Sequence, residues 1–324
     1  MNICLVGSIL RHTIETDGGS YSGWGGMTES AVAPFATLLR DDTHNSKIYF
    51  VGSVGKDDIA EVKAFFATNY PFVDTTGIRI NPTGTDHHHG TKHFVKRRVQ
   101  VEPTRYEHIE PYIHKADVVI FNFGNIDDID PEAIQKVKEH SKALVYVDVH
   151  RKPFGADEQG YMYTRGWPGW EKYLKYADVV QMDKNECEAL FGKKLVRIED
   201  VVSCAKEILD TGAGETIITL GSEGALVGHR TPSHAFSVTP AVSCDVRDTT
   251  GCGDAFAAGY LVSRHEGMHL FRAVGLGATT AAVNCEFVGY MKDISRADIE
   301  KRAPTNFNVS EVTPEIALRI IRAV

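Results

Sequence analysis

The strongest constraint on the fold is the regular alternation of short apolar, β-branched runs with longer stretches of helical spacing. Such alternation is typical of a buried parallel sheet whose connecting helices cover both faces. Strands are expected at Asn2–Val6, Lys47–Val51, Asp117–Phe121, Ala143–Val147, Ala177–Gln181 and Thr216–Leu220. Helices are expected at Met27–Leu39, Asp57–Thr68, Pro131–Lys142, Lys184–Phe191 and Glu199–Thr211. The pattern predicts an α/β fold with a doubly wound, mainly parallel sheet flanked by helices, in a single domain over residues 1–324.

Two polar segments interrupt this alternation. Arg11–Trp24 alternates polar and apolar residues around a Gly-Gly turn, which is typical of a β-hairpin. Gly77–Val101 is also β-like and contains Asn-Pro and Gly turn signals. Because both are too polar for core strands, we expect segments 11–24 and 77–101 to form a small projecting sheet, a lid over a site at the carboxyl ends of the strands. Its three adjacent histidines, 87–89, favour a polar loop tip over a metal site, since neighbours in a strand face opposite sides.

Composition excludes several classes of function. The chain has 35 basic and 43 acidic residues, a net charge of −8 at pH 7, which argues against a nucleic-acid or anionic-membrane binder. No apolar run approaches the roughly 18–20 residues of a membrane span, and no basic region precedes the first apolar stretch. The six cysteines form no CxxC pair and are expected to be reduced thiols. We therefore expect a cytoplasmic protein.

The segment Val246–Leu261 (VRDTTGCGDAFAAGYL) carries the strongest local signal for chemistry. Its polar, glycine-rich turn runs Asp248-Thr249-Thr250-Gly251-Cys252-Gly253. Backbone N–H groups at a helix start, together with the helix dipole, favour an anion, and Asp254 is placed to accept a proton from an attacking hydroxyl. The spacing is equally compatible with a plain turn in which Asp254 stabilises the helix dipole and the glycines allow tight packing.

The run DTTGCGDAFAAG at Asp248–Gly259 resembles the carboxyl-terminal signature of the ribokinase family, also called the PfkB carbohydrate kinases. Four further elements are similar to that family in the right order. They are the glycine pair Gly25-Gly26, expected to open a helix; VGSVGKD at Val51–Asp57, with Ala60 where glycine is common; the NxxE motif at Asn185–Glu188; and the strand-turn-strand IITLGSEGALV at Ile217–Val227. The resemblance covers nearly the whole chain and implies a ribokinase-like fold.

The resemblance implies a role for each matching residue on the donor side. Asp254 would be the catalytic base, and the amides of Gly251, Cys252 and Gly253 would form an anion hole, with Cys252 where the family usually has alanine. Asn185 and Glu188 would act on Mg²⁺ through its waters. The nucleotide would lie against Thr249, Gly221, Ser222 and Gly224. Asp248 would organise a loop for a monovalent cation such as K⁺, whereas Asn284 is out of register with the family's adenine-side asparagine.

The acceptor side departs from the family pattern. The resemblance places the substrate near Gly25, Gly26, Ser30 and His12, and Arg98 is a candidate contact because arginine binds carboxylates and phosphates. His12 stands near the family's substrate-binding aspartate, and Ser30 takes the place of its asparagine, so the pattern is not that of ribokinase itself. Asp17, Trp24 and Arg151 are further candidates for acceptor contacts.

Together the motifs predict an ATP- and Mg²⁺-dependent kinase that phosphorylates an alcohol group of a small sugar, sugar acid, polyol or nucleoside. Two alternatives stay open. One is a non-catalytic sugar- or nucleotide-sensing protein on the same fold, and the other is a dinucleotide-dependent oxidoreductase. The second is weakened because Gly7, after the first strand, is not followed by GxGxxG. A homodimer is expected, because a projecting sheet has edges that a partner can cover.

Overall fold

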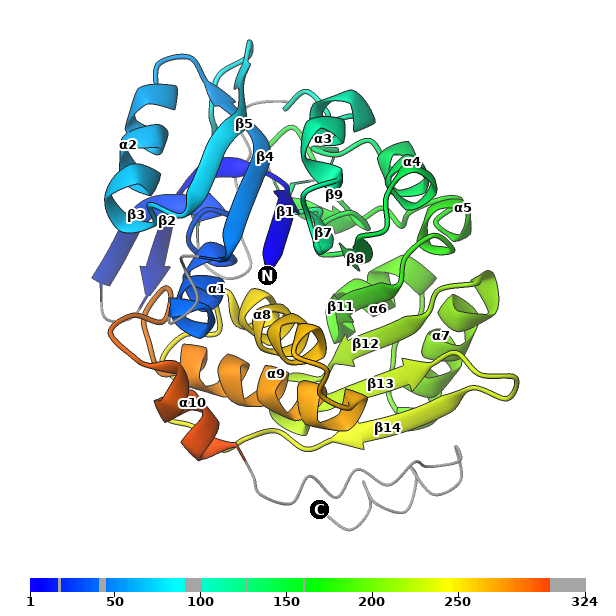
Figure 1. Ribbon diagram of the computed structural model, residues 1–324. Helices are drawn as coiled ribbons and strands as arrows, with labels where there is room; N and C mark the ends of the chain where they lie inside the picture. The colour runs from blue at the N-terminus through cyan, green and yellow to red at the C-terminus, as the bar shows by residue number, and fades with distance from the viewer. Residues whose placement is uncertain (17–18, 41–44, 91–100, 126, 160, 304–324) are drawn as a thin grey trace. The chain divides into compact units, whose positions relative to one another are not determined.

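The computed structural model describes residues 1–16, 19–40, 45–90, 101–125, 127–159 and 161–303 (Figure 1). The chain divides into two compact units. The first comprises Met1–Val32 and Asp42–Pro168, and the second Ala33–Asp41 and Gly169–Val324. The expectation of a single domain over residues 1–324 stays a prediction.

The first unit contains five parallel strands in the order β8-β7-β1-β4-β5. They are β1 (Asn2–Val6), β4 (Lys47–Gly55), β5 (Val73–Asn81), β7 (Val118–Asn122) and β8 (Leu144–Asp148). The accompanying helices are α2 (Ile59–Asn69), α3 (Tyr106–Ile113) and α4 (Glu132–His140). Leu5, Phe50, Val119 and Val145 are completely buried in its core. The apolar runs predicted β1, β4, β7 and β8 to within a few residues, because their side chains are buried on both faces, whereas β5 was not predicted.

The second unit contains β11 (Val179–Asp183) parallel to β12 (Glu215–Thr219), with antiparallel β13 (Ala225–His229) and β14 (Ala235–Thr239) following. Its helices are α5 (Glu171–Leu174), α6 (Lys184–Phe191), α7 (Ile198–Thr211), α8 (Cys252–His265), α9 (Leu270–Cys285) and α10 (Arg296–Arg302). Helices α8 and α9 pack together (Figure 1). A Cβ on Gly259 of α8 would lie 2.8 Å from the carbonyl oxygen of Leu276 in α9, so this glycine permits the close approach.

The small sheet has the strand order β3-β2-β6. β2 (Ile9–Thr16) and β3 (Gly19–Gly26) form the expected antiparallel hairpin, and β6 (Asp86–Gly90) pairs parallel to β2. The expected second lid segment, 77–101, was partly wrong, because residues 77–81 end β5 of the main sheet. β5 lies at an edge of that sheet, where polar residues are tolerated. Two short strands, β9 (Phe154–Ala156) and β10 (Met162–Thr164), pair separately and were not predicted.

The helix expected at Met27–Leu39 is shorter and begins only at Val32, as α1 (Val32–Leu38). Gly25 and Gly26 end β3 rather than opening this helix. The intervening residues form turns, and Pro34 lies in the first helical turn, where its missing N–H leaves no hydrogen bond unmade. Most of α1 belongs to the second unit, and its Phe35 and Leu38 are buried.

Within the described ranges no helix has both the length and the apolar character that a membrane span requires.

Candidate active site

The glycine-rich turn opens α8. Gly251 is the N-cap in the left-handed conformation, with φ 72°, and the amide of Ala255 donates to its carbonyl oxygen at 2.9 Å. The amide of Cys252 makes a longer turn bond of 3.3 Å to the carbonyl oxygen of Thr249, an exposed residue. Asp254 lies in the first turn and is partly buried. The turn therefore presents helix N-terminal amides and a carboxylate within four consecutive residues.

Gly253 has no conformational reason to be glycine. Its φ lies outside the left-handed region, and among the described residues a Cβ built on it would meet only Gln181 Nε2, at 3.6 Å, an ordinary contact. The side-chain amide of Gln181 donates to the Gly253 carbonyl oxygen at 3.0 Å, which fixes this residue to β11. The part of the chain that the structure describes leaves open space beside the backbone of residue 253, as a closely approaching ligand requires.

Two buried side chains hold the turn in place. Asp248 accepts hydrogen bonds from the amide of Thr250 at 3.0 Å and from the amide of Gly289 at 3.0 Å. Asn284, completely buried near the end of α9, donates to the carbonyl oxygen of Thr250 at 2.8 Å and accepts from the amide of Met291 at 3.0 Å. The turn at 248–251 is thus tied to the segment after α9. Sequence reasoning missed this role of Asn284, since the contact joins residues far apart in the chain.

The NxxE motif lies at the start of α6. Asp183 caps this helix by accepting from the amide of Glu186 at 2.8 Å, while the Glu186 side chain accepts from the amide of Asp183 at 2.7 Å. This capping box explains why the helix starts where the sequence predicted. Asn185 is exposed, and Glu188 lies one turn further along the same helix.

Glu188 is held by a neighbouring loop. Its carboxylate accepts from Lys194 Nζ at 2.5 Å and from the amide of Leu195 at 3.0 Å. Burial opposes ionisation of this carboxyl group, but the hydrogen bonds from Lys194 and Leu195 outweigh it and hold the pKa of Glu188 below its usual range. The group is therefore a carboxylate at neutral pH.

The turn between β12 and β13 has the expected strand-turn-strand form. Gly221, Ser222 and Glu223 form an exposed 3₁₀ turn, with φ 60° at Gly221. Gly224 has φ 97°, and a Cβ there would lie 1.9 Å from the carbonyl oxygen of Thr239. The fold itself therefore requires Gly224.

The predicted acceptor residues lie in the first unit. His12 is buried on β2 opposite the β3 end, and a Cβ on Gly25 would lie 2.1 Å from His12 Nδ1, so the imidazole requires this glycine. Gly26 has φ 67°, and the Ser30 hydroxyl donates to its carbonyl oxygen at 2.5 Å. His12, Gly25, Gly26 and Ser30 thus lie together, whereas Arg98 lies outside the described residues.

A buried polar network in the same unit was not predicted. Ser8, two residues after the end of β1, donates to Asp128, and the amide of Asn125 donates to the same Asp128 oxygen at 3.2 Å. Asn125 also donates to Asp86 on β6 at 2.7 Å. Burial raises the pKa of Asp128 to about 7. One sequence signal could have predicted this network. It is the polar run after β7, which lies at the carboxyl end of a strand that pairs with β1.

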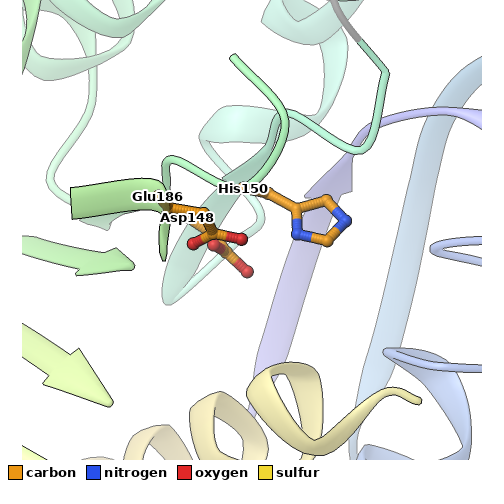
Figure 2. A group of neighbouring side chains, drawn as sticks. All are labelled: Asp148, His150 and Glu186. Carbon is orange, nitrogen blue, oxygen red and sulfur yellow. The ribbon is translucent and has the colours of Figure 1, made fainter. Parts of the chain in front are cut away.

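The end of β8 carries two further polar side chains. Figure 2 shows Asp148 and His150 there, and also labels Glu186 of α6. Asp148 accepts from the side-chain amide of Asn122 at 3.1 Å, and His150 has a left-handed backbone with φ 39°. Within α6, Glu186 takes part in the capping box with Asp183.

Comparison with known proteins decides the family. The model for the pfkB family carbohydrate kinases matches residues 36–296. The chain belongs to this family. The turn before Asp254 and the NxxE motif both lie within the matched range of the PfkB family, which confirms the resemblance drawn from the motifs.

Several curated PfkB-type relatives are similar over part of the chain. The chain is 31% identical over 144 residues to the ATP-dependent 6-phosphofructokinase of Thermoanaerobacterium thermosaccharolyticum, which covers 43% of this chain and 42% of that enzyme. It is 28% identical over 202 residues to the cytidine kinase of Thermococcus kodakarensis, covering 56% of this chain and 70% of that enzyme. The match therefore spans less than half of the phosphofructokinase.

Solved structures confirm the fold. A pyrophosphate-dependent kinase in the ribokinase family, complexed with a pyrophosphate analog and myo-inositol, matches with a TM-score of 0.72 at 19% identity, covering 92% of this chain and 99% of that one. The ribokinase of Thermotoga maritima matches with a TM-score of 0.67 at 22% identity, covering 93% and 98%. The PfkB chain thus has the ribokinase-like α/β fold, with a mostly parallel sheet, flanking helices and a small separate sheet.

Proposed function

We propose that this PfkB family protein transfers the terminal phosphoryl group of ATP to an alcohol group of a small sugar, sugar acid, polyol or nucleoside. The start of α8 carries the proposal, because open space lies beside the Gly253 backbone and Asp254 follows in the same helical turn. Curated relatives named as ATP-dependent 6-phosphofructokinase, adenosine kinase and cytidine kinase support this class of reaction.

In this mechanism the amides of Gly251, Cys252 and Gly253 stabilise negative charge on the phosphoryl group in transfer. Asp254 accepts the proton of the attacking hydroxyl, which makes that oxygen a better nucleophile. Thr249, Gly221, Ser222 and Gly224 would lie along the nucleotide. Gly221 and Ser222 are exposed.

The oxygen donors near α6 fit a magnesium ion that is bound mainly by phosphates. Mg²⁺ keeps most of its waters and needs few protein ligands, and the charged Glu188 and the exposed Asn185 suit contact through those waters. When bound, the ion would neutralise charge on the phosphates. We propose K⁺ as a further activator, bound by backbone carbonyl oxygens of the turn that Asp248 organises.

The acceptor would be bound by residues of the first unit. His12, Gly25, Gly26 and Ser30 form one group there, and Arg98 is the proposed basic contact. The buried network of Ser8, Asp86, Asn125 and Asp128 gives this unit a rigid polar base. A substrate rich in hydroxyl groups can both donate hydrogen bonds to these side chains and accept hydrogen bonds from them.

The test is ADP release with Mg²⁺ and ATP over a panel of pentoses, hexoses, ketoses, sugar acids, inositols, sugar phosphates and nucleosides. Wild type and Asp254→Asn are compared, and we expect acceptor-dependent release that falls by about 10²–10⁴-fold in the variant, the usual contribution of a general base. The exposed Asp245, on the loop before the turn, provides the matched control Asp245→Asn, which should keep full activity.

Near-normal turnover in Asp254→Asn would contradict the assigned base. If the protein binds ATP but releases no ADP with any acceptor of the panel, the result would instead favour a non-catalytic sensing protein. Parallel reactions with pyrophosphate as donor, and with KCl replaced by tetramethylammonium chloride, test the choice of donor and of monovalent cation.

A further inference from the structure

Two cysteine side chains meet at the turn before α8. Cys252 Sγ lies 2.8 Å from Cys285 Sγ, although the residues are 33 positions apart in the chain. Cys252 is the first residue of α8, and Cys285 is the last residue of α9. Neither thiol is fully buried. The pair therefore joins the anion-binding turn to the end of the neighbouring helix.

The surrounding hydrogen bonds hold the two sulfur atoms in register. Asn284 donates from the same nitrogen to the Thr250 carbonyl oxygen and, at 3.7 Å, to Cys252 Sγ. On the other side, the Cys285 carbonyl oxygen accepts from the amides of Arg247 at 2.8 Å and Asp248 at 3.1 Å. A disulfide has its sulfur atoms about 2.05 Å apart, so these two need to approach by only about 0.8 Å.

A third thiol lies beside the pair. Cys244 interacts with Cys285 and lies on a stretch whose neighbours Ser243 and Asp245 are exposed. The hydrogen bond with Cys285, and then burial, raise the pKa of Cys252.

The other three cysteines are less accessible to solvent than Cys252, Cys285 and Cys244. Cys4, Cys187 and Cys204 are completely buried. Cys187 and Cys204 also interact with each other through their side chains, which makes them an internal control for a buried thiol pair.

We propose that Cys252 and Cys285 form a reversible disulfide under oxidation by a peroxide, and that this bond switches the turn before α8 between two states. The thiolate of one cysteine of the pair attacks one oxygen of the peroxide, the O–O bond breaks, hydroxide leaves and is protonated to water, and that cysteine becomes a sulfenic acid. The sulfur of the other cysteine then attacks the sulfenic sulfur, the S–O bond breaks, and a second water leaves with the proton of the attacking thiol. The two sulfur atoms lose two electrons in total, which the peroxide gains, and a dithiol reductant reverses the change.

The functional consequence rests on the proposed kinase function. Closing the bond draws the first residue of α8 toward α9 and sets a C–S–S–C torsion near 90°, which displaces the amides at 252 and 253. Those amides must match the position of the transferred phosphoryl group closely, so we expect oxidation to lower kcat at least tenfold.

The test uses the full chain treated with one equivalent of hydrogen peroxide and then with dithiothreitol. We expect accessible-thiol titration under denaturing conditions to fall from six to four and to recover. Peptide mapping should identify the Cys252–Cys285 link. Cys285→Ser should keep basal activity, form no link and lose sensitivity to peroxide, whereas the matched control Cys204→Ser should behave as wild type.

A link between other cysteines, a sulfinic acid on one cysteine, or six unreacted thiols would overturn the proposal. If Cys285→Ser does not fold, Cys252→Ser replaces it and is scored by peptide mapping alone. Thiol titration and peptide mapping need no substrate. They therefore show whether the disulfide forms even if the kinase assay detects no activity. A disulfide that forms without any change in kcat would overturn the switch.

Discussion

At the scale of single residues, glycines 224 and 253 lack side chains for different reasons. Gly224 has φ 97° and approaches the Thr239 carbonyl oxygen so closely that a Cβ would clash. Gly253 has neither constraint. The fold requires the first glycine, whereas the proposed phosphate site would explain the second.

Gly253→Ala and Gly224→Ala should therefore separate function from folding. We expect Gly253→Ala to keep the free energy of unfolding within about 1 kcal/mol of wild type but to lower kcat/KM at least tenfold. Gly224→Ala should instead lower the free energy of unfolding by about 1–3 kcal/mol or more. Urea denaturation and steady-state kinetics on both variants test this, and full activity in Gly253→Ala would refute the anion hole.

The carboxyl group of Asp128 makes stability depend on pH. Burial raises its pKa from 3.8 to about 7, so between these values the folded state binds a proton that the unfolded state has lost. The stability that the neutral form contributes is complete below about pH 4 and is lost as pH rises through 7. The cost above pH 7 is on the order of 4 kcal/mol.

Asp128→Asn keeps a neutral side chain at every pH. We therefore expect the free energy of unfolding of Asp128→Asn, relative to wild type, to rise between pH 5 and pH 8. Urea denaturation at both pH values measures it, and a difference that does not change with pH would show that Asp128 is ionised throughout in the folded protein.

At the scale of elements, the segments flanking α8 and α9 are held together by the Asn284 side chain. Asn284→Ala removes its hydrogen bonds to the Thr250 carbonyl and the Met291 amide, and leaves both backbone groups unsatisfied. We expect a loss of about 1–3 kcal/mol in the free energy of unfolding, together with a lower kcat. Asn69→Ala on the exposed face of α2 is the control and should change stability by less than about 0.5 kcal/mol. Equal losses in both variants would contradict this role.

Comparison of the predicted and observed helices and strands shows which local sequence signals are enough to predict an element. Buried strands such as β1 and the capped helix α6 were predicted well, because apolar runs and a capping box act over a few residues. The start of α1 and the membership of residues 77–81 were wrong, because turn hydrogen bonds and edge pairing decided them. The Asn284 bridge and the Ser8–Asp128 contact join distant residues, which no local pattern encodes.

At the scale of the whole molecule, ligand binding should stabilise the folded chain by an amount that rises with the logarithm of the ligand concentration over Kd. We expect MgATP to raise the melting temperature of wild type and of Asp254→Asn alike, because the variant keeps the amides that contact phosphate. The gain is about 2.7 kcal/mol at a concentration 100-fold above Kd. Differential scanning fluorimetry measures it. A shift with pyrophosphate but none with ATP would refute ATP as the donor.

The assignment of α1 to the second unit affects how the chain is made on the ribosome. Residues 33–41 emerge early, yet the remainder of their unit begins only at Gly169. At roughly 5–20 residues per second, α1 waits several seconds or longer with Phe35 and Leu38 uncovered by their final neighbours. A nascent chain stalled before Gly169 thus presents the apolar segment of α1 without the rest of its unit, the kind of surface that chaperones bind.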